Sequence, residues 1–402
     1  MSLSSTLPAR ASWFGIERVI AYSRVFVALY AIAIIVWLAL SPGLVDPKNK
    51  PIGTDFMDVW AAGRLALDGE PAAAYDYARH YDVQMHALPW HAGEPVPFFG
   101  WHYPPMFLLP AAALAMLPYG IALLLWMAAT LPAYLAVARA VLPARFALLS
   151  AFAFPGTFVN LGHGQNGFLT AGLLGGGLLL LERRPWLAGA LFGLLAYKPQ
   201  FGVLIPLALV AARQWRAIGG ACATLAVTAF ASYAVFGRET WSAFFASAKL
   251  TRTIILEQGA TGWPKIQSAF AAVRMLGGEI ALAYAVQGVT TILAATAVVW
   301  IWRRDAAMPL KGAALATATL LATPYVLDYD LMLLALPLAW IAMAGVRDGF
   351  LPWERPVLAA AWLLPILSRS IGSAVHVPVA PLVLLLLLAA ILRRSMVEKS
   401  AA

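Results

Sequence analysis

The chain has 402 residues, of which 62% are hydrophobic and only 12% are charged, and its formal net charge is +9. A soluble domain carries roughly 25% charged residues, so this composition excludes a soluble globular protein. The basic residues occur in short clusters between apolar runs, and no segment resembles a nucleic-acid-binding module, so the positive charge indicates membrane topology and no nucleic-acid partner.

The first apolar run predicts an uncleaved membrane span. Arg10, Arg18 and Arg24 precede the run at 25–41, which is longer than the apolar core of a cleaved signal peptide. Residues 1–24 are therefore expected to form a cytoplasmic N-terminus.

Apolar runs recur to the C-terminus. A spanning helix needs about 20 apolar residues, and fewer where it is buried in protein. The run 104–118 is short and bracketed by prolines, so it is expected to be an interfacial or re-entrant helix. The sequence predicts an all-α polytopic membrane protein with a single membrane-embedded domain, 1–402, and about 12 transmembrane helices. The expected spans are 25–41, 121–141, 146–161, 167–181, 186–197, 200–212, 216–236, 280–302, 309–326, 329–346, 356–371 and 377–392.

The basic pairs predict the orientation. Arg183 and Arg184, like the pairs at 303–304 and 393–394, fall in connections that alternate with connections almost free of basic residues. The positive-inside bias places the basic connections in the cytoplasm. Lys198 and Arg369 are the exceptions on the outer side. The expected outer face includes a long first loop, 42–103, that carries interfacial helices, and a second long loop, 237–279; the central spans occupy 104–236 and the C-terminal spans 280–402.

Polar groups gather at this outer face, where they are costly next to the bilayer. Asp55 and Asp58 follow the first span, and a carboxylate there could take a proton from a hydroxyl as a general base. The alternative is a solvated carboxylate that caps the next helix. Gln165 and Asn166 lie in a glycine-rich turn and offer the paired donors and acceptors that suit sugar hydroxyls; the alternative is a flexible turn.

Two further places are polar. Lys198, followed by Gln200, offers an ammonium to a phosphate oxygen, or it is a snorkelling lysine. Asp328 and Asp330 interrupt an apolar run. They could bind a divalent cation together with a phosphate, bind sugar hydroxyls, pair with Lys198, or simply break a helix.

The histidines predict no standard metal site. Their spacing fits no known zinc-ligand pattern. No cofactor is expected, and a divalent metal stays open. The residues are His80, His86, His91, His102 and His163.

These motifs, taken in order, resemble glycosyltransferase family 87 over about residues 50–345. The residues that carry the resemblance are Asp55-Phe56, Trp60-Ala61-Ala62-Gly63, Gly69, Ala74-Tyr75-Asp76, Tyr103-Pro104-Pro105, Gly164-Gln165, Arg184-Pro185 with Ala188-Gly189, Tyr197-Lys198-Pro199-Gln200, Trp263-Pro264-Lys265, Thr323-Pro324-Tyr325 and Tyr329-Asp330.

The resemblance implies a GT-C fold and transfer of mannose, or a related hexose, from a polyprenyl-phosphate sugar. The first-loop aspartate of the family matches Asp55, which is therefore the first catalytic candidate, and Asp58 is the second. Where the mannosyltransferases of the family often have a histidine near the last motif, this chain has Asp328-Tyr329-Asp330.

The reaction we expect is one inverting displacement. Asp55 deprotonates the acceptor hydroxyl, and Lys198, with Lys265 or Arg252, stabilises the departing lipid phosphate. Gln165, Asn166 and Asp330 position the sugar. The expected donor- and acceptor-binding set is Tyr103, Gln165, Asn166, Lys198, Gln200, Lys265, Tyr329 and Asp330.

The expected partners are a polyprenyl-phosphate sugar and a lipid or glycan acceptor. The expected location is the bacterial inner (cytoplasmic) membrane, with the site facing the periplasm or exterior. The alternatives are a transporter or flippase of lipid-linked sugars, a non-catalytic membrane scaffold, and a polymerase or ligase that uses a lipid diphosphate. Transporters often contain internal repeats, and no convincing repeat is visible in this chain.

Overall fold

The structure, a computed structural model, describes residues 16–400, and these residues are almost entirely helical, with only two isolated β-bridges. The α-helices are α1 (Ile16–Ala39), α2 (Phe56–Leu67), α3 (Tyr77–Met85), α4 (Leu108–Ala115), α5 (Tyr119–Val141), α6 (Ala144–Ala153), α7 (Pro155–His163), α8 (Gly167–Leu180), α9 (Pro185–Leu194), α10 (Pro199–Gly202), α11 (Leu204–Ala211), α12 (Trp215–Thr251), α13 (Ala269–Met275), α14 (Ile280–Trp302), α15 (Met308–Ala322), α16 (Ala335–Asp348), α17 (Glu354–Val375) and α18 (Val379–Ser400). The short 3-10 or π-type turns are η1 (Pro42–Leu44), η2 (Pro71–Tyr75), η3 (Pro105–Phe107), η4 (Leu195–Tyr197), η5 (Arg252–Glu257), η6 (Trp263–Lys265) and η7 (Asp328–Leu334).

The helices confirm an all-α integral membrane protein. Seven helical segments of the described chain are long and apolar enough to cross a membrane: those built on α1, α5, α12, α14, α16, α17 and α18. Helices α6 and α7 together form an eighth candidate, which is bent by 58°. Residues 1–15 of the expected cytoplasmic N-terminus lie outside the described residues, and residues 16–24 form the first part of α1, so this helix begins before the expected start of the span at 25.

The prediction of about 12 spans is not confirmed, because four of the expected spans form apolar helices of only 10–17 residues, at 167–180, 185–197, 199–211 and 308–322. Burial in protein explains why the short helices α8 and α15 suffice, whereas α9 and α11 keep exposed apolar side chains such as Leu187 and Val210. Nearly every residue of α15 from Leu310 to Ala322 is buried, so the helix needs no length to match the lipid around it.

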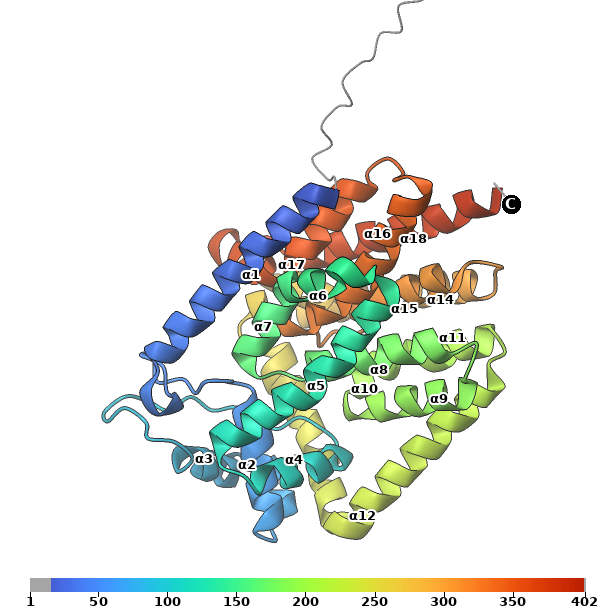
Figure 1. The fold of residues 1–402 in the computed structure, drawn as a ribbon. Coiled ribbons are helices and arrows are strands. Elements are labelled where there is room, and N and C mark those ends of the chain that lie inside the picture. The colour runs from blue at the N-terminus through green and yellow to red at the C-terminus, as the bar shows by residue number, and fades with distance from the viewer. Residues whose placement is uncertain (1–15, 401–402) are drawn as a thin grey trace, which may run out of the picture.

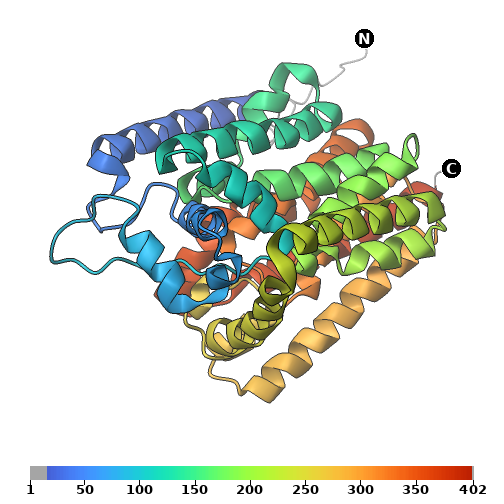
Figure 2. The ribbon, with the colours of Figure 1, turned by 90° about the horizontal axis from the view of Figure 1, so that it is seen from below.

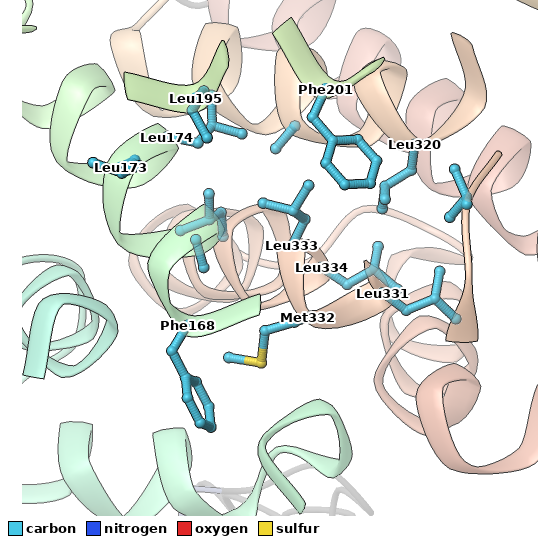
Figure 3. Packing of buried hydrophobic residues seen from close by; sticks show 14 of the residues in the cluster. Phe168, Leu173, Leu174, Leu195, Phe201, Leu320, Leu331, Met332, Leu333 and Leu334 are labelled. Carbon is cyan, nitrogen blue, oxygen red and sulfur yellow. The ribbon is translucent and has the colours of Figure 1, made fainter. Parts of the chain in front are cut away.

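The centre of the hydrophobic core is formed by α8 and η7. Phe168 and Leu174 of α8, Phe201, and the run Leu331–Leu334 of η7 pack together between the surrounding helices (Figure 3). This packing fixes the N-terminal ends of α8 and η7, which carry the polar residues described below.

The first loop forms its own layer. Helices α2, α3 and α4 lie together at the end of the molecule away from the C-terminus and from the start of α1 (Figures 1 and 2). Gly63 lets α2 approach α4 closely, because a Cβ at that position would lie 2.1 Å from the carbonyl oxygen of Ala111. The indole of Trp60 donates to the carbonyl of Leu117 at 2.9 Å.

The expected second loop, 237–279, is mostly helical. Helix α12 continues past residue 236 to Thr251 and bends at Gly237, whose φ of 76° lies in the left-handed region; Figure 1 shows this bend. The chain then forms η5, η6 and α13. Ile266 bridges to Leu327, and Gln267 N donates to Val326 O at 2.7 Å, so this segment is tied to the residues that precede η7.

Candidate active site

Two glycine-containing loops meet at Asp55. The backbone N–H of Asp55 donates to the carbonyl of His163 at 2.9 Å. Gly164, with φ of 61°, ends α7 in the left-handed region, which favours glycine. A Cβ on Gly164 would lie 2.8 Å from Cβ of Phe56 and 3.1 Å from Cα of Gly53. The close approach of these loops therefore depends on the absence of a side chain at position 164.

The Asp55 carboxylate faces this junction. Its side chain does not cap α2, although Asp55 stands at the N-cap position. It accepts instead from Gln165 Nε2 at 3.2 Å and from Thr54 Oγ1 at 3.3 Å. Thr54 also contacts His163 Nδ1 at 3.2 Å. The helix-capping interpretation is therefore wrong for this side chain.

The surroundings of Asp55 favour its ionised form. Burial raises the pKa of this carboxyl, but the electrostatic interactions with Lys265 and His163 and the hydrogen bonds from Gln165 and Thr54 outweigh burial and lower the pKa below its ordinary value. Because the side chain also remains partly exposed, an ionised carboxylate is accessible at this position.

Asp58 behaves differently. It is buried one turn along α2, and its Oδ1 has no hydrogen-bond partner among the described residues. Burial, and then the negative charge of Asp55, hold the pKa of Asp58 well above its ordinary value. The two carboxyls thus have opposite protonation preferences, which is the pattern that separates a base from a neutral hydrogen-bonding group.

Asn166 connects three aromatic or polar groups. Its Nδ2 donates to the hydroxyl of Tyr103 at 2.7 Å, and its backbone N–H donates to Gln165 Oε1 at 2.7 Å. Its carbonyl accepts from the hydroxyl of Tyr197 at 3.2 Å. Its Oδ1 is buried without a partner among the described residues. The glycine-rich turn is therefore ordered by hydrogen bonds and is not a loose connection.

Lys198 and Asp330 form a buried ion pair. Nζ of Lys198 lies 2.7 Å from Oδ1 of Asp330, and the two side chains are 5% and 3% exposed. The other oxygen of Asp330 accepts from the backbone N–H of Leu327 at 2.9 Å. The snorkelling interpretation of Lys198 is wrong, and of the alternatives for the two aspartates the structure shows the pairing of Asp330 with Lys198.

Asp328 and Asp330 engage different cations. Oδ2 of Asp328 lies 3.3 Å from Arg369 NH1, and Oδ1 of Asp328 accepts from the backbone N–H of Tyr329 at 3.0 Å. Each carboxylate thus pairs with a different basic side chain: Asp328 with Arg369, and Asp330 with Lys198. The hypothesis that the two aspartates bind one divalent cation together therefore lacks the paired geometry that it needs.

Lys265 is the remaining cation of the site. Its ammonium lies 5.3 Å from the ring centroid of Tyr329, and that of Lys198 lies 5.4 Å from the same ring. Lys265 is partly exposed and forms no ion pair within residues 16–400. It makes the largest electrostatic contribution that lowers the pKa of Asp55. An ammonium that forms no direct ion pair among the described residues therefore lies near the ionised carboxylate.

Some predicted residues do not join this cluster. Gln200 makes none of the hydrogen bonds above. Arg252 pairs with Glu257 at 3.3 Å, so its charge is compensated. In the first loop, His86 contacts its own helix at Asp82 O and His91 contacts Asp46 O. No three His, Cys, Asp or Glu side chains in the described part of the chain are arranged to hold a metal ion.

Asn160 belongs to this polar cluster, although the sequence did not single it out. Its Nδ2 donates to the carbonyl of Tyr329 at 2.9 Å, and its Oδ1 accepts from Gly167 N at 3.0 Å. It therefore joins α7, the start of α8 and η7. An asparagine inside the apolar run 146–161 is the signal that could have identified it.

A protein-family model described as glycosyltransferase family 87 matches residues 101–324, which is more than half of the chain. The matched region contains Tyr103, Gln165, Asn166, Lys198 and Lys265, whereas the first-loop aspartates lie before it and η7 lies after it. Comparisons with curated proteins and with solved structures gave no match.

Proposed function

Because the chain belongs to glycosyltransferase family 87, we propose that it transfers a hexose, mannose first, from a polyprenyl-phosphate sugar to a lipid or glycan acceptor. The observation that carries this proposal is the environment of Asp55. An ionised, partly exposed carboxylate lies where two glycine-containing loops meet, near Lys265, an ammonium that forms no ion pair within residues 16–400.

The reaction is a single displacement with inversion. Asp55 removes the proton from the acceptor hydroxyl as that oxygen attacks the anomeric carbon. The bond between the anomeric carbon and the phosphate oxygen breaks, and its electron pair leaves with the polyprenyl phosphate. The proton remains on Asp55. No cofactor enters this balance, because the donor carries the sugar in activated form.

Lys265 stabilises the departing phosphate. An ammonium contributes most to a developing negative charge when no other anion compensates it. Lys198 is already paired with Asp330 at 2.7 Å in a buried site. The carboxylate therefore compensates most of the charge of this ammonium. Lys198 therefore acts as a positioning residue that holds η7 and the ring of Tyr329, and Lys265 contacts the donor.

The sugar is held by groups that lack partners in the protein. Buried polar atoms are normally hydrogen-bonded, so each exception calls for an explanation. Oδ1 of Asn166 and Oδ1 of Asp58 are two such atoms. The proposed role of Asn166 is to accept from a sugar hydroxyl, and neutral Asp58 donates to one. Gln165 and Tyr103 complete the sugar contacts.

The proposed fold is of the GT-C type, in which the shorter apolar helices, together with the longer spans, make up a set of about 12 membrane-embedded helices. The proposed location is the bacterial inner membrane. The basic pairs at 183–184, 303–304 and 393–394 support a cytoplasmic side opposite the first loop. The site then faces the periplasm or exterior.

The test uses purified protein in nanodiscs with radiolabelled polyprenyl-phosphate mannose and a membrane-lipid extract. Label should enter new products with wild type, and the rate should fall at least ~100-fold with Asp55→Asn, within the usual contribution of general-base catalysis. Asp76→Asn is the matched control, because Asp76 is a first-loop carboxylate that caps α3 at Arg79 N. A parallel reaction with a chelator tests dependence on a divalent metal.

Each other outcome points to a different function. Transfer that survives Asp55→Asn would assign the base to another carboxylate, Asp58 or Asp330. Transfer from a lipid diphosphate alone would identify a polymerase or ligase. No transfer from any donor, together with movement of a labelled lipid-linked sugar across vesicles, would identify a flippase. Full cellular function in Asp55→Asn without transfer would indicate a scaffold.

A further inference from the structure

A groove lies between α11 and α14, away from the candidate active site. It has a volume of about 630 Å³ and is lined by Leu207, Ala295, Thr296, Val299, Trp300, Arg303 and Arg304. Its volume falls within the range of about 300–1,000 Å³ that ordinary small-ligand sites occupy. The helical part of the wall is apolar, and both arginines lie just after the C-terminal end of α14.

The surroundings of the groove face lipid. On α14, Ile292 and Leu293 are exposed, and Val210 of α11 and Val203, the residue just before α11, are exposed as well. Because these surfaces belong to apolar helices of a membrane protein, the groove opens to acyl chains and not to water. The arginines then lie at the level where a helix that spans the membrane reaches the head groups.

The arginines are available to an anion. Neither Arg303 nor Arg304 forms an ion pair with a residue between 16 and 400. Arg304 is held over the ring of Trp300, with Cζ 3.9 Å from the ring centroid. This cation–π contact fixes the guanidinium at the end of the apolar groove while leaving its N–H donors free. Membrane topology requires only that basic residues lie in a cytoplasmic connection, and it does not require that a guanidinium be held at the end of an apolar groove.

We propose that this groove binds an anionic phospholipid of the surrounding membrane. One acyl chain lies along Leu207, Ala295 and Val299, and the phosphate accepts from Arg303 and Arg304. Basic pockets between membrane helices recognise anionic head groups by this combination of charge and apolar wall. This site is distinct from the one at Asp55, and it does not depend on the proposed reaction.

The test is native mass spectrometry of protein released from vesicles that contain cardiolipin, phosphatidylglycerol and phosphatidylcholine. Wild type should retain the anionic lipids in preference to phosphatidylcholine. The double variant Arg303→Gln/Arg304→Gln should retain them roughly 30-fold less well, from about one electrostatic contact per arginine. The matched control is Arg183→Gln/Arg184→Gln, an exposed basic pair in another connection, and it should behave as wild type.

A second variant tests the apolar part of the site without changing charge. Thr296→Trp places a large side chain in the groove and should reduce retention of the anionic lipids while both arginines remain. Thermal unfolding in detergent checks that each variant is folded. Equal retention by wild type and the double variant, equal retention of phosphatidylcholine, or displacement of the phospholipids by polyprenyl phosphate would overturn the proposal. If the double variant does not fold, unchanged retention by Thr296→Trp would overturn it.

Discussion

The buried pair of Lys198 and Asp330 gives the sharpest test of how the site is built. Replacing Lys198 with Met leaves the carboxylate of Asp330 in a position where only 3% of the side chain is exposed. Breaking a buried ion pair in this way costs about 3–5 kcal/mol. Because Asp330 keeps its hydrogen bond from Leu327 N, we expect a value near 3 kcal/mol, at the lower end of that range.

The double variant Lys198→Met/Asp330→Asn separates the effect of the unpaired charge from the effect of changing side-chain size. It removes both charges, and the amide oxygen can still accept from Leu327 N. Stability should then recover to within about 1 kcal/mol of wild type, since replacing both members of a buried pair is often nearly neutral. Unfolding by titration with a denaturing detergent, followed by tryptophan fluorescence, measures both variants.

The same pair of variants tests the assignment of the phosphate contact. If Lys198 only positions η7, the folded double variant should retain sugar transfer within roughly tenfold of wild type, about 1.4 kcal/mol. A stable double variant with no transfer would refute the assignment to Lys265. A Lys198→Met cost below about 1 kcal/mol would refute the buried-pair argument itself. The pair Glu354–Arg394, at 2.6 Å and equally buried, serves as control: Glu354→Gln should reduce stability without changing the donor KM.

Three further predictions follow from the same geometry. Lys265→Met should lower kcat/KM for the donor about 10- to 150-fold, which corresponds to the loss of a hydrogen bond to a charged group. Lys265→Arg should retain most of this kcat/KM. A donor titration measures both variants, and an unchanged KM and kcat would contradict the proposed contact. Burial and Asp55 hold the pKa of Asp58 above its ordinary 3.8, so its contribution to stability is complete below that value and is lost as pH rises through the folded pKa. Asp58→Asn should therefore show a smaller fall of the unfolding temperature with rising pH, and it should keep more transfer activity than Asp55→Asn; equal pH slopes would show that Asp58 is ionised in the folded protein. Gly164→Ala places a side chain in the left-handed region and against Phe56, so it should cost at least about 1–2 kcal/mol and slow transfer, and wild-type stability would refute the close-approach argument.

Local sequence determined the character of the chain. Apolar runs, which need no partner to be recognised, predicted α5, α14 and α17 to within four residues of their observed bounds, whereas α1 begins nine residues before its expected start at 25 and α18 ends eight residues after its expected end at 392. The ordered motifs identified the family, and a family model confirms it. The number of spans could not be predicted in this way, because the sequence of a short apolar run does not show whether protein or lipid surrounds the helix. Only packing shows that α15 is enclosed by other helices.

The tertiary structure decided what each polar residue does. Sequence could list Asp55, Lys198, Lys265 and Asp330 as candidates, but charge compensation depends on distances across the fold. Lys198 and Asp330 are 132 positions apart and meet at 2.7 Å, which removes Lys198 from the free cations and leaves Lys265. Asp55, at the N-cap position of α2, and Asp58, within α2, are three positions apart, yet Asp55 accepts from the side chains of Gln165 and Thr54 whereas Oδ1 of Asp58 has no hydrogen-bond partner among the described residues. The chemistry of a carboxylate or an ammonium is set by its neighbours, and those neighbours come from distant parts of the chain.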